Sequence, residues 1–344
     1  MPLTVGLTFD LKQDYPQEMS SAADDDCELD SPETIDAIAS ALEKNGHKVF
    51  KLGGGRNLPQ TFEIVKPDIV FNISEGLYGR NRESQVPAIL EMYQIPYTGS
   101  DPLTLSICLD KSMAKKIISY SNIPTPAFKK VEEVDDIYGL DELDFEFPLF
   151  IKPCYEGSSK GIRLDSKIKN ISALKEKTLQ LLGTYRQPVL IEEYLPGPEF
   201  TIGVLGNKKP EIVGIMEVRS LNNQNKELIY SYEVKKDWEN QVQYLCPPPI
   251  SPKLESEIKK IAINSYRALE CRDVARIDIR LDKHGTPNFL EVNPLPGLMP
   301  GYSDLYIMAK AVGINYNVLV NKILSYAIER YPHLRINNCR SLFV

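Results

Sequence analysis

Residues 273–294, DVARIDIRLDKHGTPNFLEVNP, contain two runs of strand-like composition on either side of a short polar segment. Side chains two positions apart in a strand point to the same face of a sheet. Arg276 and Asp278 therefore share a face, and Glu291 and Asn293 do so as well. The stretch predicts an antiparallel hairpin that gathers charged and amide side chains on one side.

The turn of this hairpin determines which residues lie opposite each other. His284 and Gly285 can form a two-residue hairpin turn. Counting outward from that turn pairs Asp278 with Glu291, and the other two polar residues then also lie opposite each other. All four side chains are expected on one face.

Two carboxylates directly opposite each other repel and destabilise a sheet, whereas a divalent cation between them would reverse this effect. Asp278, Glu291 and the amide of Asn293 offer only oxygen ligands, which favour Mg²⁺ over zinc. Arg276 would add a fixed positive charge beside the metal ions. The following segment, NPLPGLMPG, is rich in proline and glycine and restrains the backbone there. The alternative is the solvated face of an edge hairpin.

A second informative segment is YEGSSKGI, residues 155–162, which follows the apolar run PLFIKP. Backbone N–H groups of a glycine-rich loop can form an anion-binding nest. Ser158 and Ser159 add hydroxyl donors, and Lys152 in the preceding strand can reach the same phosphate oxygens. The segment matches neither a Walker A loop nor a dinucleotide fingerprint, and an ordinary surface loop is the alternative. A nest, a lysine and a separate acidic Mg²⁺ face together are typical of ATP sites.

The bulk properties limit the class of protein. The chain has 344 residues, which predicts two or three domains, and its 42% hydrophobic and 25% charged residues are those of a globular protein. A formal net charge of -7 argues against a nucleic-acid binder. No run is long and apolar enough for a membrane helix, and the N-terminus does not resemble a signal peptide. Six scattered cysteines without metal or redox spacing indicate free thiols and a cytoplasmic location.

The order of the expected elements suggests an α/β fold. A strand at 3–9, a helix at 31–47 and strands at 47–52 and 67–73 predict a small domain with a parallel sheet. Pro32 fits the first turn of that helix, and Ser31 can cap it. The remaining expected helices are 83–93, 109–122, 169–182, 251–270, 303–312 and 316–330, with strands at 148–153, 188–206 (two, joined by a Pro/Gly turn), 210–218 and on both sides of KHGTP.

These motifs together resemble the ATP-grasp ligases and, among them, the D-alanine–D-alanine ligases. The similarity covers IPYTGSDPLTLSICLDK, FIKPCYEGSSKGI, LIEEYLPGPEFTIGVLG, YEVKKDWENQVQYLCP, ARIDIRLD and NFLEVNPLPG, in this order. The resemblance implies an ATP-grasp fold with an N-terminal α/β domain (1–105), a central subdomain (106–190) and a C-terminal subdomain (191–344). ATP would be held between the last two.

The resemblance also implies roles for individual residues. Lys111 and Lys152 match the phosphate-binding lysines, and the loop that closes over the phosphates matches Glu156, Gly157, Ser158, Ser159 and Gly161. Glu199 matches the residue that holds the ribose, and Lys235 matches a further lysine that contacts the nucleotide. Asp278, Glu291 and Asn293 match the ligands of two Mg²⁺ ions, for which Mn²⁺ can substitute. The positions that match the adenine contacts are Glu192, Glu193, Tyr194 and Leu195.

The expected substrate site rests on fewer matches. Arg276 matches the arginine that stabilises the charged intermediate and, with Ser158 of the loop, is the expected catalytic residue. Gly297 matches a backbone donor to that intermediate, and Ser303 matches the serine that binds the second substrate's carboxylate. Glu28 is the candidate for holding the first substrate's amine. The remaining candidate is Glu75, in SEGLYGRNRES, which replaces the family's His-Gly segment.

The sequence departs from the D-alanine–D-alanine ligase pattern around the amino-acid pockets. The family's Glu-Arg-Glu-Val-Ser motif is absent, the usual Lys-Tyr pair is Lys235-Lys236, and the turn PGLMPGYS is one residue longer. The ATP and metal motifs are complete. The expected reaction joins two amino acids through an acyl phosphate, as in peptidoglycan synthesis, in a cytoplasmic homodimer. The alternatives are a ligase for a different pair of amino acids and a catalytically inactive nucleotide-binding protein.

Overall fold

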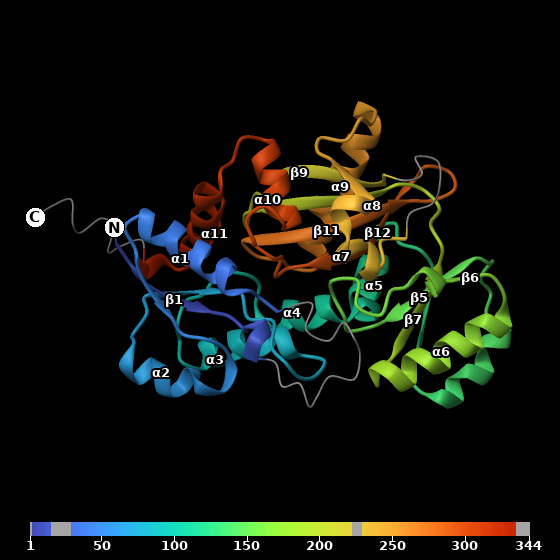
Figure 1. Cartoon of the computed structure of the whole chain (residues 1–344), viewed down its shortest axis with the longest axis horizontal. Helices are drawn as coiled ribbons and strands as arrows, with labels where there is room; N and C mark the ends of the chain where they lie inside the picture. The colour runs from blue at the N-terminus through green and yellow to red at the C-terminus, as the bar shows by residue number, and fades with distance from the viewer. Residues whose placement is uncertain (1, 15–28, 222–228, 335–344) are drawn as a thin grey trace, which may run out of the picture.

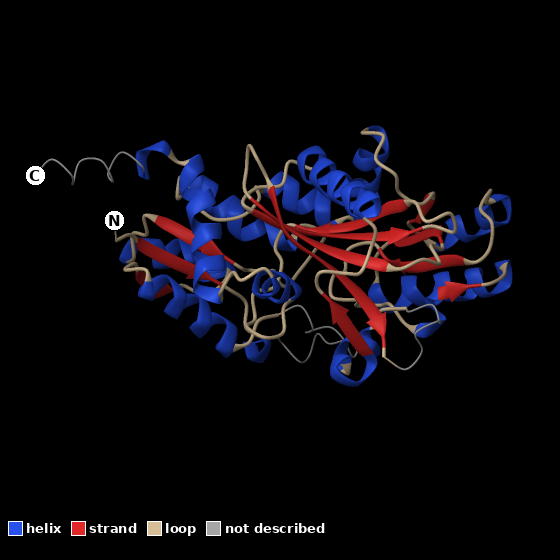
Figure 2. Ribbon diagram, turned by 90° about the horizontal axis from the view of Figure 1, so that it is seen from above, coloured by secondary structure: helices blue, strands red, loops and turns tan. Residues whose placement is uncertain are grey.

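The structure is a computed structural model, and it describes residues 2–14, 29–221 and 229–334. Its described part contains three β-sheets, each flanked by helices (Figure 1). The strands of the first sheet lie beside the N-terminus, apart from the long strands of the largest sheet (Figure 2). The mixed α/β architecture expected from the sequence is confirmed.

The first sheet is parallel, with strand order β2-β1-β3. Ser31 caps the first helix by accepting a hydrogen bond from the backbone N–H of Thr34. The predicted strand–helix–strand unit is therefore confirmed, with its cap. Its elements are β1 (Thr4–Thr8), β2 (Lys48–Lys51), β3 (Ile69–Asn72), α1 (Pro32–Lys44), α2 (Leu58–Ile64) and α3 (Gln85–Met92).

The second sheet is antiparallel, with strand order β4-β7-β5-β6. Its core contains buried leucine, isoleucine and valine side chains from the strands and from one long helix. The predicted buried strand and the predicted helix of this region are both present. The elements are β4 (Phe128–Val131), β5 (Leu149–Pro153), β6 (Lys167–Ile168), β7 (Val189–Glu193) and α6 (Ile171–Tyr185).

The third sheet is also antiparallel, with strand order β10-β9-β8-β11-β12. Helices α4, α5 and α9 contribute to the apolar core on one face, whereas α10 packs against β8 and β9 from the other. The elements are β8 (Glu199–Leu205), β9 (Glu211–Ser220), β10 (Val242–Leu245), β11 (Val274–Leu281), β12 (Pro287–Asn293), α4 (Pro102–Leu109), α5 (Lys111–Tyr120), α7 (Tyr232–Lys236), α8 (Trp238–Gln241), α9 (Pro252–Ala268), α10 (Asp304–Ala311) and α11 (Tyr316–Arg330).

Strands β7 and β8, which we expected in the same region, belong to different sheets. Strand β7 already pairs with β4 on one edge and with β5 on the other, so it has no free edge for β8. The segment between them crosses to the third sheet, where the N–H of Gly197 donates to the carbonyl of Leu281. The second sheet therefore extends to Glu193, beyond the boundary expected at residue 190.

The hairpin of β11 and β12 has the predicted pairing but not the predicted turn. Asp282 and Thr286 close the turn through a backbone hydrogen bond, so the loop has three residues rather than the two expected. A three-residue loop alone would shift every pair by one position. A bulge at Leu290 removes that shift, because Ile279 pairs with Phe289 and the next pair inward is Asp278 with Glu291.

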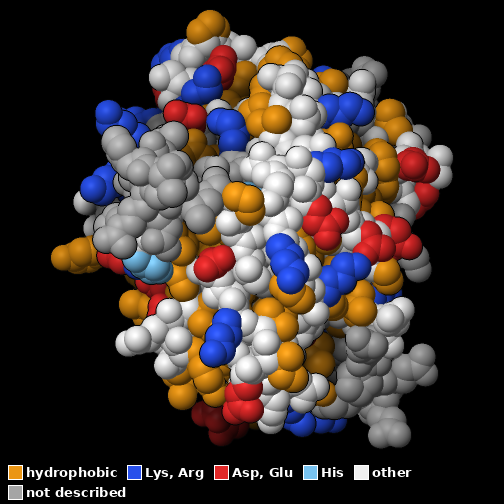
Figure 3. Space-filling view, turned by 90° about the vertical axis from the view of Figure 1, so that its left-hand side faces the viewer, with side chains coloured by type: hydrophobic (Ala, Val, Ile, Leu, Met, Phe, Trp, Pro, Cys, Tyr) orange, Lys and Arg blue, Asp and Glu red, His pale blue; other side chains and the backbone are white. Residues whose placement is uncertain are grey.

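Two further features of the molecule are its surface charges and the lengths of its helices. On the face drawn in Figure 3, Lys and Arg side chains are interspersed with Asp and Glu rather than gathered. In the described ranges, no helix is long and apolar enough to cross a membrane.

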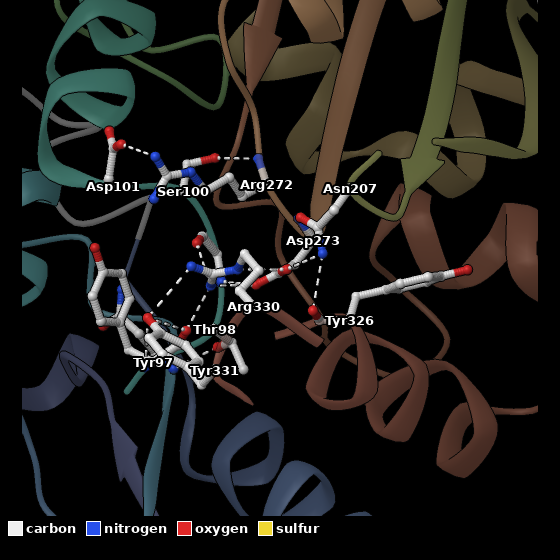
Figure 4. A network of polar contacts seen from close by, with 12 residues as sticks. Tyr97, Thr98, Ser100, Asp101, Asn207, Arg272, Asp273, Tyr326, Arg330 and Tyr331 are labelled. Atoms are coloured by element: carbon white, nitrogen blue, oxygen red, sulfur yellow. Dashed lines mark hydrogen bonds and ion pairs between the residues drawn. The ribbon is translucent and has the colours of Figure 1, made fainter. Parts of the chain in front are cut away.

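A polar network joins the first and third sheets (Figure 4). Asp273, just before β11, is fully buried, and one of its oxygens lies 2.7 Å from the guanidinium of Arg330 in α11. Arg330 also donates to the carbonyls of Tyr97 and Gly99, and the N–H of Gly99 donates to Asp273. Through Arg330, helix α11 therefore links the segment that follows the first sheet to the start of β11.

Candidate functional site

An open cleft of about 940 Å³ lies between the second and third sheets. Strands β5 and β7 and the loop after β5 form one side, and strands β8, β11 and β12 form the other. Most of the residues predicted for the nucleotide and metal site line this cleft. These are Lys111, Lys152, Glu156, Ser158, Ser159, Glu192, Glu193, Tyr194, Leu195, Glu199, Arg276, Asp278 and Glu291.

The acidic face of the hairpin is as predicted. Asp278 lies opposite Glu291 in the register, and on its other side it accepts a hydrogen bond of 2.9 Å from the hydroxyl of Thr201 in β8. Arg276 contacts Asp278 at 3.0 Å and Asp304 at 3.4 Å. Burial raises the pKa of Asp278, and the charge of Arg276 opposes this effect. The guanidinium therefore helps to keep this buried carboxylate ionised.

Two lysines approach the same face, Lys111 from the start of α5 and Lys152 from β5 of the second sheet. The ammonium of Lys111 lies 3.5 Å from Glu291, and that of Lys152 lies 3.9 Å from it. Burial would raise the pKa of Glu291, but Lys111, Lys152 and Arg276 outweigh it and lower the pKa to about 2. Glu291 is therefore ionised, and the cleft holds fixed positive charge close to it.

The ammonium of Lys152 forms an ion pair with the carboxylate of Glu192 in β7, at 2.9 Å. Burial disfavours the charged form of Lys152, yet the carboxylates of Glu192 and Glu291 outweigh this effect and raise its pKa. Glu192 is also 3.0 Å from Lys115. The side chain of Glu192 is thus part of an ion network that orients Lys152.

The donors on the hairpin fit a magnesium ion. Asp278 and Glu291 supply carboxylate oxygens, and the amide oxygen of Asn293 accepts one hydrogen bond, from the N–H of Leu295 at 2.8 Å. An amide oxygen has two lone pairs, so one is left for a cation. Within the described ranges, no group of three or more His, Cys, Asp or Glu side chains could hold a metal ion. A metal here would be held by two carboxylates and one amide, which are hard oxygen ligands.

The glycine-serine loop lies over the cleft and is tied down at its far end. Ser158 and Ser159 both have left-handed backbone conformations, with φ of 48° and 61°. The hydroxyl of Ser159 donates to the carbonyl of Tyr230 at 2.9 Å, and the N–H of Tyr232 donates to the carbonyl of Ile162. The two serines line the cleft, whereas Gly157 lines a smaller cavity beside it. Gly161 is a residue of the same loop but lies outside the cleft lining.

The residues predicted for adenine and ribose also line the cleft. Glu199 pairs with Arg280 at 3.1 Å, and burial raises the pKa of Glu199 although Arg280 opposes it. Arg280 also donates to the hydroxyl of Tyr194 at 3.2 Å. Leu195 is 7% exposed and lines the cleft, so it is both a core residue and a wall of the site.

A second cavity, of about 870 Å³, adjoins the cleft and contains most of the predicted substrate residues. The two share Ser158, Tyr230, Arg276 and Asp304. Glu75, Asn293, Gly297 and Ser303 line the second cavity, together with Asp30, Tyr244 and Tyr302. The hydroxyl of Ser303 accepts a hydrogen bond from the N–H of Met299 at 2.8 Å.

Two predicted site residues are not placed by the structure. Glu28 lies outside the described residues. Lys235 belongs to helix α7, but its side chain also lies outside the described part. Their expected roles stay predictions.

Several residues of the site were not singled out in the sequence. A local pattern could have indicated two of them, whereas no such pattern exists for the others. Lys115 is one helical turn beyond Lys111, and Arg280 is two residues beyond Asp278 on the same face of β11. Thr201 faces Asp278 from a strand 77 positions away in sequence, which no local pattern reveals. The same is true of Tyr230 and Asp304, which line both cavities.

The comparisons with known proteins agree with this geometry. A family model described as "D-ala D-ala ligase C-terminus" matches residues 117–325. Solved structures of similar fold include a D-alanine–D-alanine ligase from Bacillus anthracis complexed with ATP, with a TM-score of 0.71 at 23% identity over 95% of this chain and 98% of that chain. Another is VanG D-Ala:D-Ser ligase from Enterococcus faecalis, with a TM-score of 0.70 at 21% identity over 95% and 100%. The fold is that of the ATP-grasp ligases.

Relatives found by sequence similarity identify the family within the ATP-grasp ligases. A D-alanine–D-alanine ligase from Carboxydothermus hydrogenoformans is 34% identical over 302 residues, which cover 86% of this chain and 93% of the relative. The uncharacterized protein y4sG of Sinorhizobium fredii is 33% identical over 308 residues, or 86% of this chain and 88% of the relative. The chain belongs to the D-alanine–D-alanine ligase family.

Proposed function

We propose that the protein is an ATP-dependent, ADP-forming carboxylate–amine ligase that joins two amino acids through an acyl phosphate. The observation that carries this proposal is the convergence of Lys111, Lys152 and Glu291 with the loop serines in one cleft. Family membership supports the same reaction, because named relatives are D-alanine–D-alanine ligases. We infer that this cleft binds ATP.

In the first step, a carboxylate oxygen of the first amino acid attacks the γ-phosphorus of ATP, and ADP leaves. The lysines Lys111 and Lys152 would neutralise the phosphate oxygens, while Arg276 would stabilise charge where the two cavities meet. Glu199 and residues 192–195 would hold the nucleoside. Bound Mg²⁺, for which Asp278, Glu291 and Asn293 are the ligands we propose, would supply further charge neutralisation.

In the second step, the amine of the second amino acid attacks the acyl carbon, and phosphate leaves. The second cavity would hold both amino acids, with Ser303 and the N–H of Gly297 at the carboxylate side. The loop 156–161 would keep water away from the acyl phosphate while it waits for the amine. Ser158 lines both cavities and could contact the nucleotide and the substrate.

A phosphate-release screen over D- and L-amino acids, singly and in pairs, tests this proposal. We expect ADP and phosphate to form together with a dipeptide. Glu291→Ala should abolish ADP release, because the metal face loses one of its two carboxylates, whereas Glu257→Ala on the surface of α9 should not. Full turnover of Glu291→Ala would contradict the assignment of this face.

A ligase for a different pair of amino acids is the second candidate. Among the described residues, the second cavity is lined by the acidic side chains of Asp30, Glu75 and Asp304 and by one guanidinium, that of Arg276. Glu75 belongs to the segment that replaces the family's His-Gly segment. Activity with D-alanine alone would support a role in peptidoglycan synthesis, and activity only with other amino acids would support the second candidate.

We further infer a homodimer in the cytoplasm. Ile64, Met92 and Tyr93 are exposed at the ends of α2 and α3, where the rings of Phe62 and Tyr93 are 5.4 Å apart. These apolar side chains support pairing through the N-terminal domain. The described cysteines are all free thiols, which is consistent with a reducing compartment. Light scattering after size-exclusion chromatography would test the dimer, and a mass of 38.9 kDa would contradict it.

A further inference from the structure

One loop of the N-terminal domain contacts the start of the glycine-serine loop, residues 155–162, which we call the phosphate-binding loop. The N-terminal loop, residues 74–84, connects β3 to α3 and folds back on itself. Gly76 has φ of +70°, its N–H donates to Asp10 at 2.9 Å, and an added Cβ would lie 2.4 Å from the carbonyl oxygen of Arg82. Only glycine fits this approach. The two ends of the loop, Glu75 and Arg82, are therefore packed as one unit.

Arg82 reaches from this unit to the phosphate-binding loop. One guanidinium nitrogen donates to the carbonyl of Tyr155 at 2.8 Å, and the other lies 3.7 Å from the carboxylate of Glu156. Both charged side chains are only 9% exposed. A buried planar fork that holds a carbonyl and a carboxylate at once fixes their relative orientation, which a lysine cannot do.

Glu156 is also held by its own loop and by the central subdomain. The side chain of Gln187 donates to it at 2.6 Å, and Lys160 lies 3.2 Å from it. The carbonyl of Glu156 accepts a hydrogen bond from the ammonium of Lys111. The position of Glu156 therefore influences both the loop and a lysine that points into the cleft.

Arg80, in the same N-terminal loop, contacts the helix that carries Lys111. It lies 2.6 Å from Asp110, which is fully buried. Asp110 is the N-cap of α5 and accepts hydrogen bonds from the N–H groups of Ser112 and Met113. Two arginines of one loop thus contact both the start of α5 and the root of the phosphate-binding loop.

We propose that Arg82 is a positioning residue through which the N-terminal domain holds the phosphate-binding loop closed over the cleft, with Arg80 fixing the start of the helix that carries Lys111. Glu75, at the other end of the packed unit, lines the second cavity. A ligand in that second cavity is therefore connected, through Glu75 and Arg82, to the phosphate-binding loop that lies over the cleft. This inference rests on the proposed function only in assuming that a nucleotide occupies the cleft.

Hydrogen exchange of residues 155–163 tests the proposal without requiring ligase activity. We expect Arg82→Met to increase exchange there at least about tenfold in the presence of a non-hydrolysable ATP analogue and Mg²⁺, because the loop opens more often. The control is Arg272→Met, which removes an ion pair to Asp101 that also joins the N-terminal region to the third sheet but does not involve the loop. The control should leave this exchange unchanged.

Coupling of the two half-reactions gives a second readout in the active enzyme. An open loop admits water to the acyl phosphate, so Arg82→Met should release several ADP molecules per dipeptide and lower kcat by about 10- to 100-fold, with a smaller change in the KM for ATP. Arg82→Lys should lie between the wild type and Arg82→Met. If Arg82→Met does not fold, Arg82→Lys is used in its place for both measurements.

Two results would overturn the proposal. One is exchange in residues 155–163 that stays at the wild-type rate in both Arg82 variants. The other is exchange that rises equally across the molecule, which would indicate a general loss of stability. If the wild type itself forms no amide bond, the exchange measurement still decides the role of Arg82, and only the proposed reaction fails.

Discussion

Glu192 illustrates how single buried charges organise this site. It lies between Lys115 at 3.0 Å and Lys152 at 2.9 Å, and all three side chains are nearly inaccessible. Burial would raise the pKa of Glu192, but the two lysines outweigh it and lower the pKa. Burial lowers the pKa of Lys115 to about 8, although the charge of Glu192 opposes this effect. Near neutral pH, Lys115 therefore keeps its charge and neutralises Glu192.

Lys115→Met should destabilise the protein by roughly 3 kcal/mol, because a buried carboxylate then keeps only one of its two cations. It should also weaken ATP binding, since Glu192 would draw closer to Lys152. Urea unfolding and the KM for ATP measure the two effects. Lys116→Met, one position along the same helix and exposed, should change stability by less than about 0.5 kcal/mol. Equal effects of the two substitutions would contradict this account of the network.

The ionisation of Asp30 should make the free energy of unfolding depend on pH. Burial and the nearby charge of Asp10 raise its pKa to about 7. An acid with a higher pKa in the folded than in the unfolded protein stabilises the fold fully below its unfolded pKa, and this contribution is lost as pH rises through the folded pKa. The free energy of unfolding should therefore fall between about pH 4 and pH 7, with a slope of up to about 1.4 kcal/mol per pH unit.

Asp30→Asn cannot ionise, so its stability should vary less over this range than that of the wild type. Urea unfolding at several pH values measures the difference. Asp36→Asn, an exposed carboxylate in α1 whose side chain is 66% accessible, is the control and should follow the wild type. Parallel curves for the wild type and Asp30→Asn would show that burial does not act on Asp30 as described.

The hairpin of β11 and β12 shows what the sequence could and could not predict. Alternation placed Asp278 and Glu291 on one face, opposite each other, and the structure confirms both points. The two-residue turn was wrong, because Asp282 accepts hydrogen bonds from the N–H groups of His284 and Thr286 and stabilises a longer loop. The bulge at Leu290 compensates for that turn, and no residue type in the stretch indicates a bulge.

The turn also provides a test of its own conformation. Gly285 has φ of +79°, and an added Cβ would meet nothing within 4 Å. Gly285→Ala should therefore cost only about 1 kcal/mol, from backbone strain without a clash. Gly285→Asn should cost less, because asparagine tolerates the left-handed conformation better. Both variants should keep wild-type kcat, and a loss of activity would mean that the turn affects the metal face. Urea unfolding and steady-state kinetics check these values.

The third sheet brings together residues from distant parts of the chain. The parallel first sheet followed from the sequence, because it depends on local patterns. The separation of β7 from β8 and the packing of α11 against α1 did not, because both depend on which sheet edges and helix faces are already occupied. The second cavity was likewise beyond local patterns, since its walls come from all three parts of the chain.

The network of Figure 4 should contribute strongly to stability. Arg330→Met leaves Asp273 buried without its cation, which should cost about 3–5 kcal/mol. Arg272→Met removes a more exposed pair with Asp101 and should cost less than about 1 kcal/mol. Urea unfolding of the two variants makes the comparison. A smaller effect of Arg330→Met than of Arg272→Met would contradict the central place of Asp273.

An oxygen-isotope experiment tests whether the cleft activates a carboxylate as an acyl phosphate. The carboxylate oxygen that attacks the γ-phosphorus stays with phosphate when the amine displaces it. With a first amino acid labelled with ¹⁸O in its carboxylate, we predict one ¹⁸O atom in phosphate for each dipeptide formed. Unlabelled phosphate accompanying the dipeptide would contradict the account.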